Sequence, residues 1–152
     1  MPTKNLQLTT INGSDVVNPE VFNTNFTILD KLGVDYVVEK GTSGEWWYRK
    51  WNSGRAECGI DDKDFGSVAH NTAWGGLHVS GSLTFGSYPF SFASRPFVSI
   101  SFNSNSAGNH TSYVATTSST SNTSAPNFYL VDPNSGTATS SHFGIFVAGK
   151  WK

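Results

Sequence analysis

Cysteine and charge are both scarce in this chain. The single cysteine, Cys58, cannot form an intrachain disulfide. Charged residues make up 14% of the 152 positions, against about 25% in ordinary soluble domains. The formal net charge is −1, so the chain lacks the basic field with which nucleic-acid-binding proteins displace counterions. We therefore expect neither a disulfide-stapled domain nor a nucleic-acid partner.

Long apolar segments are also missing. No run approaches the ~20 apolar residues that span a bilayer, so we expect no membrane insertion. The opening residues lack the apolar core of a secretory signal, and we expect synthesis in a reducing cytoplasm. Aromatic residues, in contrast, reach 14%, and 15 glycines accompany many Ser, Thr and Asn residues. This composition is typical of an all-β protein with polar, uncharged loops.

The N-terminal part, residues 1–33, is predicted to be an arm followed by a short helix. Asn18 suits the N-cap and Pro19 suits the first helical position, while Gly33 ends the pattern. An apolar stripe recurs at i, i+4 and i+7, namely Phe22, Phe26 and Leu29. A helix of about four turns is too short to be stable alone. This segment should therefore pack on a domain or on copies of itself, as an attachment or trimerisation segment.

Residues 34–152 are predicted to form one β-rich domain. Short segments with apolar alternation are separated by turn-forming residues, which indicates an antiparallel β-sandwich or a small barrel. The predicted strands cover residues 36–39, 46–51, 55–60, 77–85, 98–102, 113–117, 128–131 and 143–147. Residues 61–64 are expected to form a charged loop, and residues 132–136 a turn.

The segment 46–60 is the clearest predicted hairpin, with 52–54 as its glycine-closed turn. Alternation places Trp47, Arg49 and Trp51 on one face and Trp46, Tyr48 and Lys50 on the other. Such an aromatic ribbon must bury itself against its own domain or another copy. We expect Trp47 and Trp51 to be the structurally buried pair.

Three segments carry a resemblance to a known family. They are the hairpin run Trp-Tyr-Arg-Lys-Trp with its glycine turn and Ala-Glu-Cys return, the unit at 88–101, and the C-terminal run 143–152 ending in Gly-Lys-Trp-Lys. In this order they resemble the C-terminal tip modules of bacteriophage tail fibres and related virion proteins. The chain departs from that pattern at Gly59, where those modules often have an aromatic residue.

The resemblance implies a homotrimer that joins other phage tail or baseplate proteins and binds a saccharide on the host surface. It places the protein in the virion, in the tail or a fibre, after synthesis in the bacterial cytoplasm. A purely structural fibre or decoration protein without a ligand is the alternative. A cell-wall depolymerase is a third, weaker possibility.

Residues that could carry catalysis or bind metal lack a supporting pattern. Cys58 has no histidine in a recognisable catalytic frame, and a small buried strand residue is the simpler interpretation. The carboxylates of Asp61, Asp62 and Asp64 do not have the spacing of a defined calcium loop. We expect no enzyme activity, no metal and no cofactor.

The ligand-binding candidates are isolated aromatic residues among polar neighbours. Trp74 lies in the small-residue segment 71–76 beside Asn71, and Tyr113 follows Asn109 and His110. An aromatic face stacks on the C–H groups of a sugar while amides and hydroxyls bind its hydroxyl groups. A tryptophan that covers the core edge or a subunit seam is the competing interpretation of Trp74.

Overall fold

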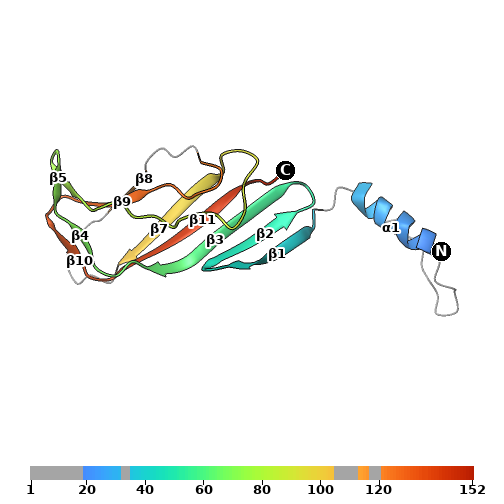
Figure 1. Cartoon of the computed structure of the whole chain (residues 1–152), viewed down its shortest axis with the longest axis horizontal. Helices are drawn as coiled ribbons and strands as arrows, with labels where there is room; N and C mark the ends of the chain where they lie inside the picture. The colour runs from blue at the N-terminus through green and yellow to red at the C-terminus, as the bar shows by residue number, and fades with distance from the viewer. Residues whose placement is uncertain (1–18, 32–34, 105–112, 117–120) are drawn as a thin grey trace. The chain divides into compact units, whose positions relative to one another are not determined.

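The computed structural model describes residues 19–31, 35–104, 113–116 and 121–152. The chain divides into two units, Met1–Tyr36 and Val37–Lys152. In the first unit, α1 spans Pro19–Lys31 and has Glu20 in its first turn, which confirms the predicted helix (Figure 1). The ring of Phe26 is 62% exposed on this helix.

The second unit is built from antiparallel strands. Their bounds are β1 (Val37–Ser43), β2 (Trp46–Trp51), β3 (Arg55–Asp64), β4 (Val68–His70), β5 (Thr72–Trp74), β6 (Leu77–Val79), β7 (Phe97–Ser104), β8 (Tyr113–Thr116), β9 (Phe128–Asp132), β10 (Gly136–Ala138) and β11 (Ser141–Lys150). They form a five-stranded sheet in the order β1-β2-β3-β11-β7, a four-stranded sheet β5-β6-β9-β8 and the pair β10-β4. The prediction of antiparallel β structure is confirmed, and the sheets do not close into a barrel.

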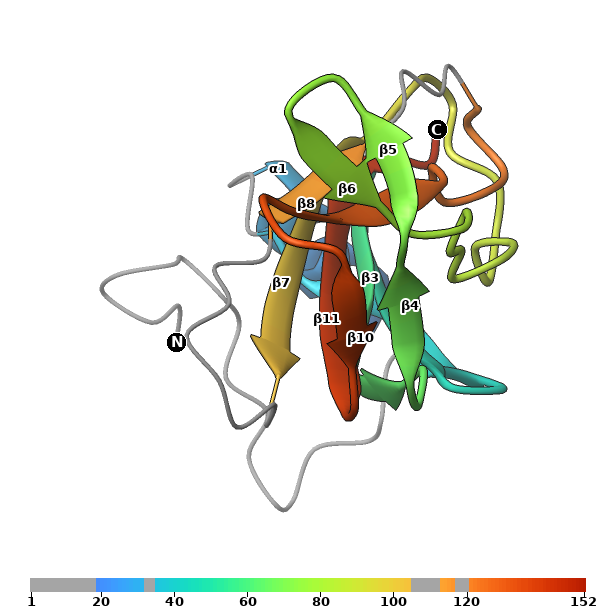
Figure 2. The ribbon, with the colours of Figure 1, turned by 90° about the vertical axis from the view of Figure 1, so that its left-hand side faces the viewer.

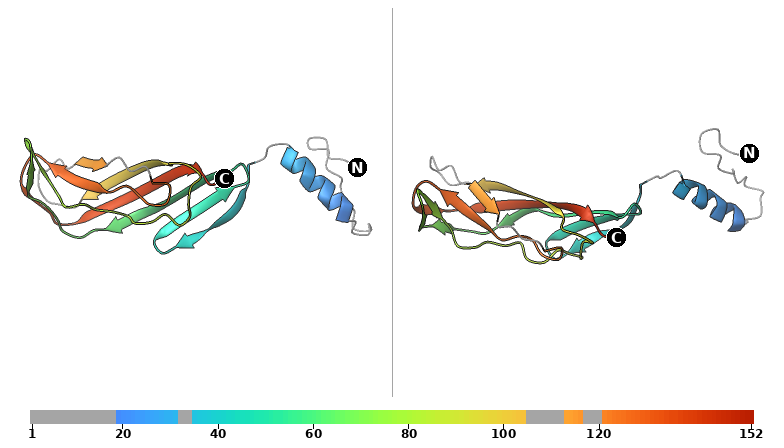
Figure 3. Two further views of the ribbon diagram at one scale, coloured as in Figure 1. Left: turned by 45° about the horizontal axis from the view of Figure 1, so that its top comes forward. Right: turned by 90° about the horizontal axis from the view of Figure 1, so that it is seen from above.

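The five-stranded sheet and β9 form two layers (Figure 3), and the core side chains lie between them. Phe128 of β9 stacks on Phe85 with ring centroids 5.2 Å apart and meets Phe143 of β11 at 4.9 Å. Phe65 contacts all three of these rings edge-on. Offset and edge-to-face aromatic pairs stabilise a core beyond the area that they bury. This cluster joins the two layers.

The predicted hairpin forms, but its buried face is the opposite of the one expected. Gly54 closes the turn with a φ of 87°, which favours glycine. Trp46 is only 6% exposed and meets Tyr88 at 5.7 Å, whereas Trp47 and Trp51 are partly exposed. The reason lies in the next strand, β3, whose buried side chains face the core on the Trp46 side. These are Ala56, Cys58 and Ile60.

The Lys50 ammonium lies among three aromatic side chains. Its Nζ lies 4.8 Å from the Phe90 centroid, 5.4 Å from Trp151 and 5.7 Å from Tyr48. It also makes a 2.9 Å ion pair with Glu39 on β1. Cation–π contacts and an ion pair together compensate the desolvation of this cation. These contacts of Lys50 therefore connect the hairpin with the segment around Phe90 and with the C-terminal segment.

The Glu39–Lys50 pair predicts a pH dependence. The hydrogen bond from Lys50 lowers the pKa of Glu39 below its ordinary value. A lowered carboxyl pKa contributes stability above the unfolded-state pKa, and this contribution is lost as the pH falls through the folded-state pKa. An NMR pH titration should show the low Glu39 pKa, and Lys50→Met should raise it. Lys40→Met is the matched control, because Lys40 pairs with Arg49 on the other face. An unchanged Glu39 pKa in Lys50→Met would contradict this assignment.

Two predicted boundaries are wrong. Residues 61–64 belong to β3 instead of a charged loop, because β11 extends far enough to pair with Asp64. The predicted strand 77–85 stops at Val79. The Ser80 hydroxyl then donates to the Gly81 carbonyl and accepts from the Leu130 amide, which interrupts the regular ladder.

Candidate functional site

The sequence-predicted residues Asn71 and Trp74 lie at one end of the second unit. Figure 2 looks onto this end, where β4, β5, β6 and β10 meet. Trp74 is 59% exposed and pairs with Leu77 across a turn in which Gly75 has a φ of 61°. The small-residue segment 71–76 therefore belongs to a tight hairpin. The Asn71 side-chain oxygen accepts a 3.0 Å hydrogen bond from the Ser135 hydroxyl, so this amide is partly engaged within the fold.

The second predicted cluster is only partly described. Tyr113 begins β8, where its backbone pairs with Val131 of β9, while Asn109 and His110 lie outside the described residues. Strands β6 and β9 separate β8 from β5 in the sheet. The structure therefore places Trp74 and Tyr113 on one sheet with two strands between them.

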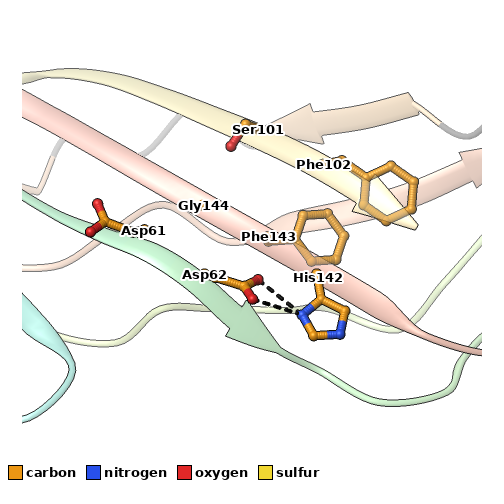
Figure 4. A pocket seen from close by; sticks show the side chains of 7 residues that line it. All are labelled: Asp61, Asp62, Ser101, Phe102, His142, Phe143 and Gly144. Atoms are coloured by element: carbon orange, nitrogen blue, oxygen red, sulfur yellow. Dashed lines mark hydrogen bonds and ion pairs between the residues drawn. The ribbon is translucent and has the colours of Figure 1, made fainter. Parts of the chain in front are cut away.

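A shallow hollow of about 420 Å³ lies on the five-stranded sheet, where β3, β11 and β7 run side by side (Figure 4). Its polar lining is Asp61, Asp62, Ser101 and His142, with Gly144, Phe102 and Phe143 completing it. The β3–β11 register shifts at Gly144, and such a bulge re-aims neighbouring side chains. A Cβ on Gly144 would lie 2.7 Å from the Ser101 Oγ and 2.8 Å from the Asp61 carbonyl oxygen. Glycine at this position keeps the hollow open.

The hollow is acidic, and its carboxylates are oriented by neighbouring side chains. His142 Nδ1 lies 2.9 Å and 3.1 Å from the two Asp62 carboxylate oxygens, and its Nε2 lies 3.8 Å from Asp64. The Trp47 indole N–H donates a 2.8 Å hydrogen bond to Asp61. Within the part of the chain that the structure describes, no three histidine, cysteine or acidic side chains are grouped as metal ligands.

Trp47 forms an aromatic platform beside this hollow. A Cβ on Gly59 would lie 2.7 Å from Trp47 Cζ2, so the indole lies against the bare backbone of β3. Its N–H is held by Asp61, and the Phe146 ring lies 6.2 Å away at a 40° tilt. The Arg49 guanidinium carbon is 5.7 Å from the indole centroid. The ring is therefore held in place while remaining partly open to solvent.

The candidate site lies on the outer face of the five-stranded sheet, which carries Trp47, Asp61, His142 and Phe146. The sequence did not predict a site on this face. The sequence predicts that Trp47 is buried, and it gives no role to His142 or Phe146. One signal is present in the sequence: Gly59 lies inside a strand, and a glycine there often marks a close approach. The pairing of His142 with Asp62, across 80 positions of sequence, has no local signal.

Cys58 does not contribute a reactive group. It is buried on the inner face of β3, and burial raises the pKa of its thiol to about 12. The thiolate is the nucleophilic form of cysteine, so this side chain is a packing residue at neutral pH.

The arrangement on the outer face is suited to recognition of a polar ligand. A fixed aromatic ring adjoins carboxylates, a hydroxyl and an imidazole, the combination that meets both the C–H and the O–H groups of a sugar.

None of the helices within the described ranges is long and apolar enough to cross a membrane. Comparisons with protein-family models, with curated proteins and with solved structures found no match.

Proposed function

We propose that this chain is the trimeric tip module of a phage tail fibre or baseplate protein, and that it attaches the virion to a glycan on the host surface. The observation that carries the glycan part is the fixed Trp47 platform beside the polar hollow. An indole held by Asp61 and by the bare backbone at Gly59 loses little conformational freedom when a ligand binds, and preorganisation of this kind favours affinity.

The arrangement of the three resembling segments supports the phage part. They are separated in sequence, yet they contribute the adjacent strands β2, β3, β11 and β7 of one sheet. Phe90 from the middle segment meets Tyr48 of the hairpin with centroids 5.9 Å apart. The C-terminal Trp151 donates from its indole to the Trp51 carbonyl at 3.0 Å. Residues that define the resemblance therefore form one structural unit.

A structural virion protein without a ligand remains the second candidate, and one observation favours it. Phe97 is 66% exposed on the same outer face. Exposed aromatic patches also mark contacts between proteins, and in this second candidate function a neighbouring subunit of the virion covers the face.

An array of bacterial surface glycans separates these two functions. The intact protein should bind a subset of glycans, with an affinity for one site of about 1 mM and a much stronger apparent affinity on a dense surface. It should also compete with virions for attachment to cells that carry those glycans. A folded protein that binds no glycan and no cell would leave the structural role as the better interpretation.

The sequence-predicted residues enter the same experiment. Trp74→Ala and Tyr113→Ala should each reduce binding if the end of the second unit contacts the receptor, whereas Trp47→Ala should reduce it if the outer face does. The melting temperature of each variant shows whether a loss of binding reflects unfolding.

A further inference from the structure

The outer face of the five-stranded sheet carries a row of aromatic side chains that crosses the strands. Trp47 on β2 and Phe146 on β11 are both paired with Gly59 on β3. Phe97 on β7 pairs with Ala148, two residues beyond Phe146 on the same face. Neighbouring strands lie ~4.8 Å apart, so the three rings cover several strand spacings. One sugar ring cannot cover such a row.

Small residues keep this row accessible. Gly59 stands between Trp47 and Phe146, Ala148 stands beside Phe97, and the exposed Ser99 faces Phe146. Gly59 has no side chain, and the side chains of Ala148 and Ser99 are shorter than the neighbouring aromatic ones. The hollow at Gly144 opens on one flank of the row and presents Ser101 and Asp61 to it.

The charges of the face select among glycans. Asp61, Asp62 and Asp64 stand on the side of the hollow, where His142 is the facing basic group. On the other side of the row, Arg49 lies 3.8 Å from Glu57, and Lys40, Arg55 and Lys150 stand on the same face beyond them, so the acidic groups are concentrated at the hollow. A carboxylate-bearing sugar in the hollow would meet like charges, which disfavours it.

We propose that this face binds an extended saccharide of at least three units, without acidic groups, that crosses the strands over Trp47, Phe146 and Phe97. This inference rests on the proposed glycan-binding function and adds the location of the site, the direction of the chain and the charge class of the ligand. Each aromatic ring stacks on one sugar; the Asp61 carboxylate accepts hydrogen bonds from sugar hydroxyl groups, and the Ser101 hydroxyl donates or accepts them.

The test uses the intact protein on an array that carries neutral, amino and acidic oligosaccharides of one to six units. Binding should rise with length up to at least three units and should be weakest for acidic chains. Phe97→Ala should remove the gain from the longer chains, a loss of about tenfold, while leaving the binding of short ones. Ser99→Arg places a long side chain in the path and should weaken every chain long enough to cross it.

Matched variants make the result specific. Phe97 and Ser99 are exposed, so both variants should fold even if Trp47→Ala does not. Trp74→Ala removes a similarly exposed aromatic residue at the end of the unit, and a loss of binding in Trp74→Ala but not in Phe97→Ala would place the site at that end and contradict this inference. Glycan binding that survives Phe97→Ala and Ser99→Arg, or that shows no length dependence, would overturn this inference alone. The absence of binding to every glycan and to host cells would overturn the proposed function with it.

Discussion

Phe143→Ala should lower the free energy of unfolding by about 3–5 kcal/mol, the usual range for a large core aromatic residue. Phe143 is 1% exposed and contacts the rings of Phe65, Phe102 and Phe128. Its removal leaves a cavity where β11 meets β9, and the surrounding rings cannot fill it without moving both sheets. Urea unfolding followed by tryptophan fluorescence measures the change.

Phe97→Ala is the matched control for this measurement. It makes the same chemical change on the exposed face of the edge strand β7 and should alter the free energy of unfolding by less than about 0.5 kcal/mol. Equal losses in the two variants would mean that the outer face is as well packed as the interior. That outcome would also remove the basis for a ligand site there.

Local signals in the sequence predicted the local structure well. Pro19 marks the start of α1, and Gly54 marks the turn between β2 and β3, because each residue suits one backbone geometry. The alternation within β2 was also correct. These features depend on neighbouring residues alone, and the sequence contains all of the information they require.

The errors share a long-range cause. Which face of β2 is buried depends on β3, and the extent of β3 depends on β11, which lies about 80 positions away in sequence. Residues 61–64 look like a solvated loop until that pairing is known. The sequence pattern predicts that Trp47 is a core residue. In the structure its indole packs on the backbone of Gly59, on the outer face of the sheet.

The candidate site could not be predicted for the same reason. Its hollow exists because Gly144 stands opposite the irregular part of β3, and its polar groups come from three strands that are neighbours only in the fold. The sequence-predicted candidates, Trp74 and Tyr113, are isolated aromatic residues in polar segments. That criterion cannot recognise a ring that is fixed by a carboxylate on a neighbouring strand, as Trp47 is by Asp61.

The helix α1 leads to the second prediction with a large effect. Phe22 and Phe26 are exposed aromatic residues on one stripe of a 13-residue helix, and such a short helix gains most of its stability from packing. The proposed homotrimer would bury this stripe. Phe26→Asp would place a charge in that contact, which is strongly unfavourable without a partner.

Phe26→Asp should therefore convert the trimer into single chains and weaken attachment to a glycan-coated surface by about 10²–10⁴-fold, because three linked sites bind far more tightly than one. Light scattering should show three times the 16.4 kDa chain mass for the parent protein and one chain mass for the variant.

Thr24→Asp is the control: Thr24 is exposed and lies about half a turn from the stripe, so it should leave both mass and attachment unchanged. Binding of a soluble oligosaccharide to one site should be equal in all three proteins, since the second unit is unaltered. A parent protein that is already monomeric would contradict the trimer, and a monomeric variant that still attaches like the parent would show that attachment does not depend on valency.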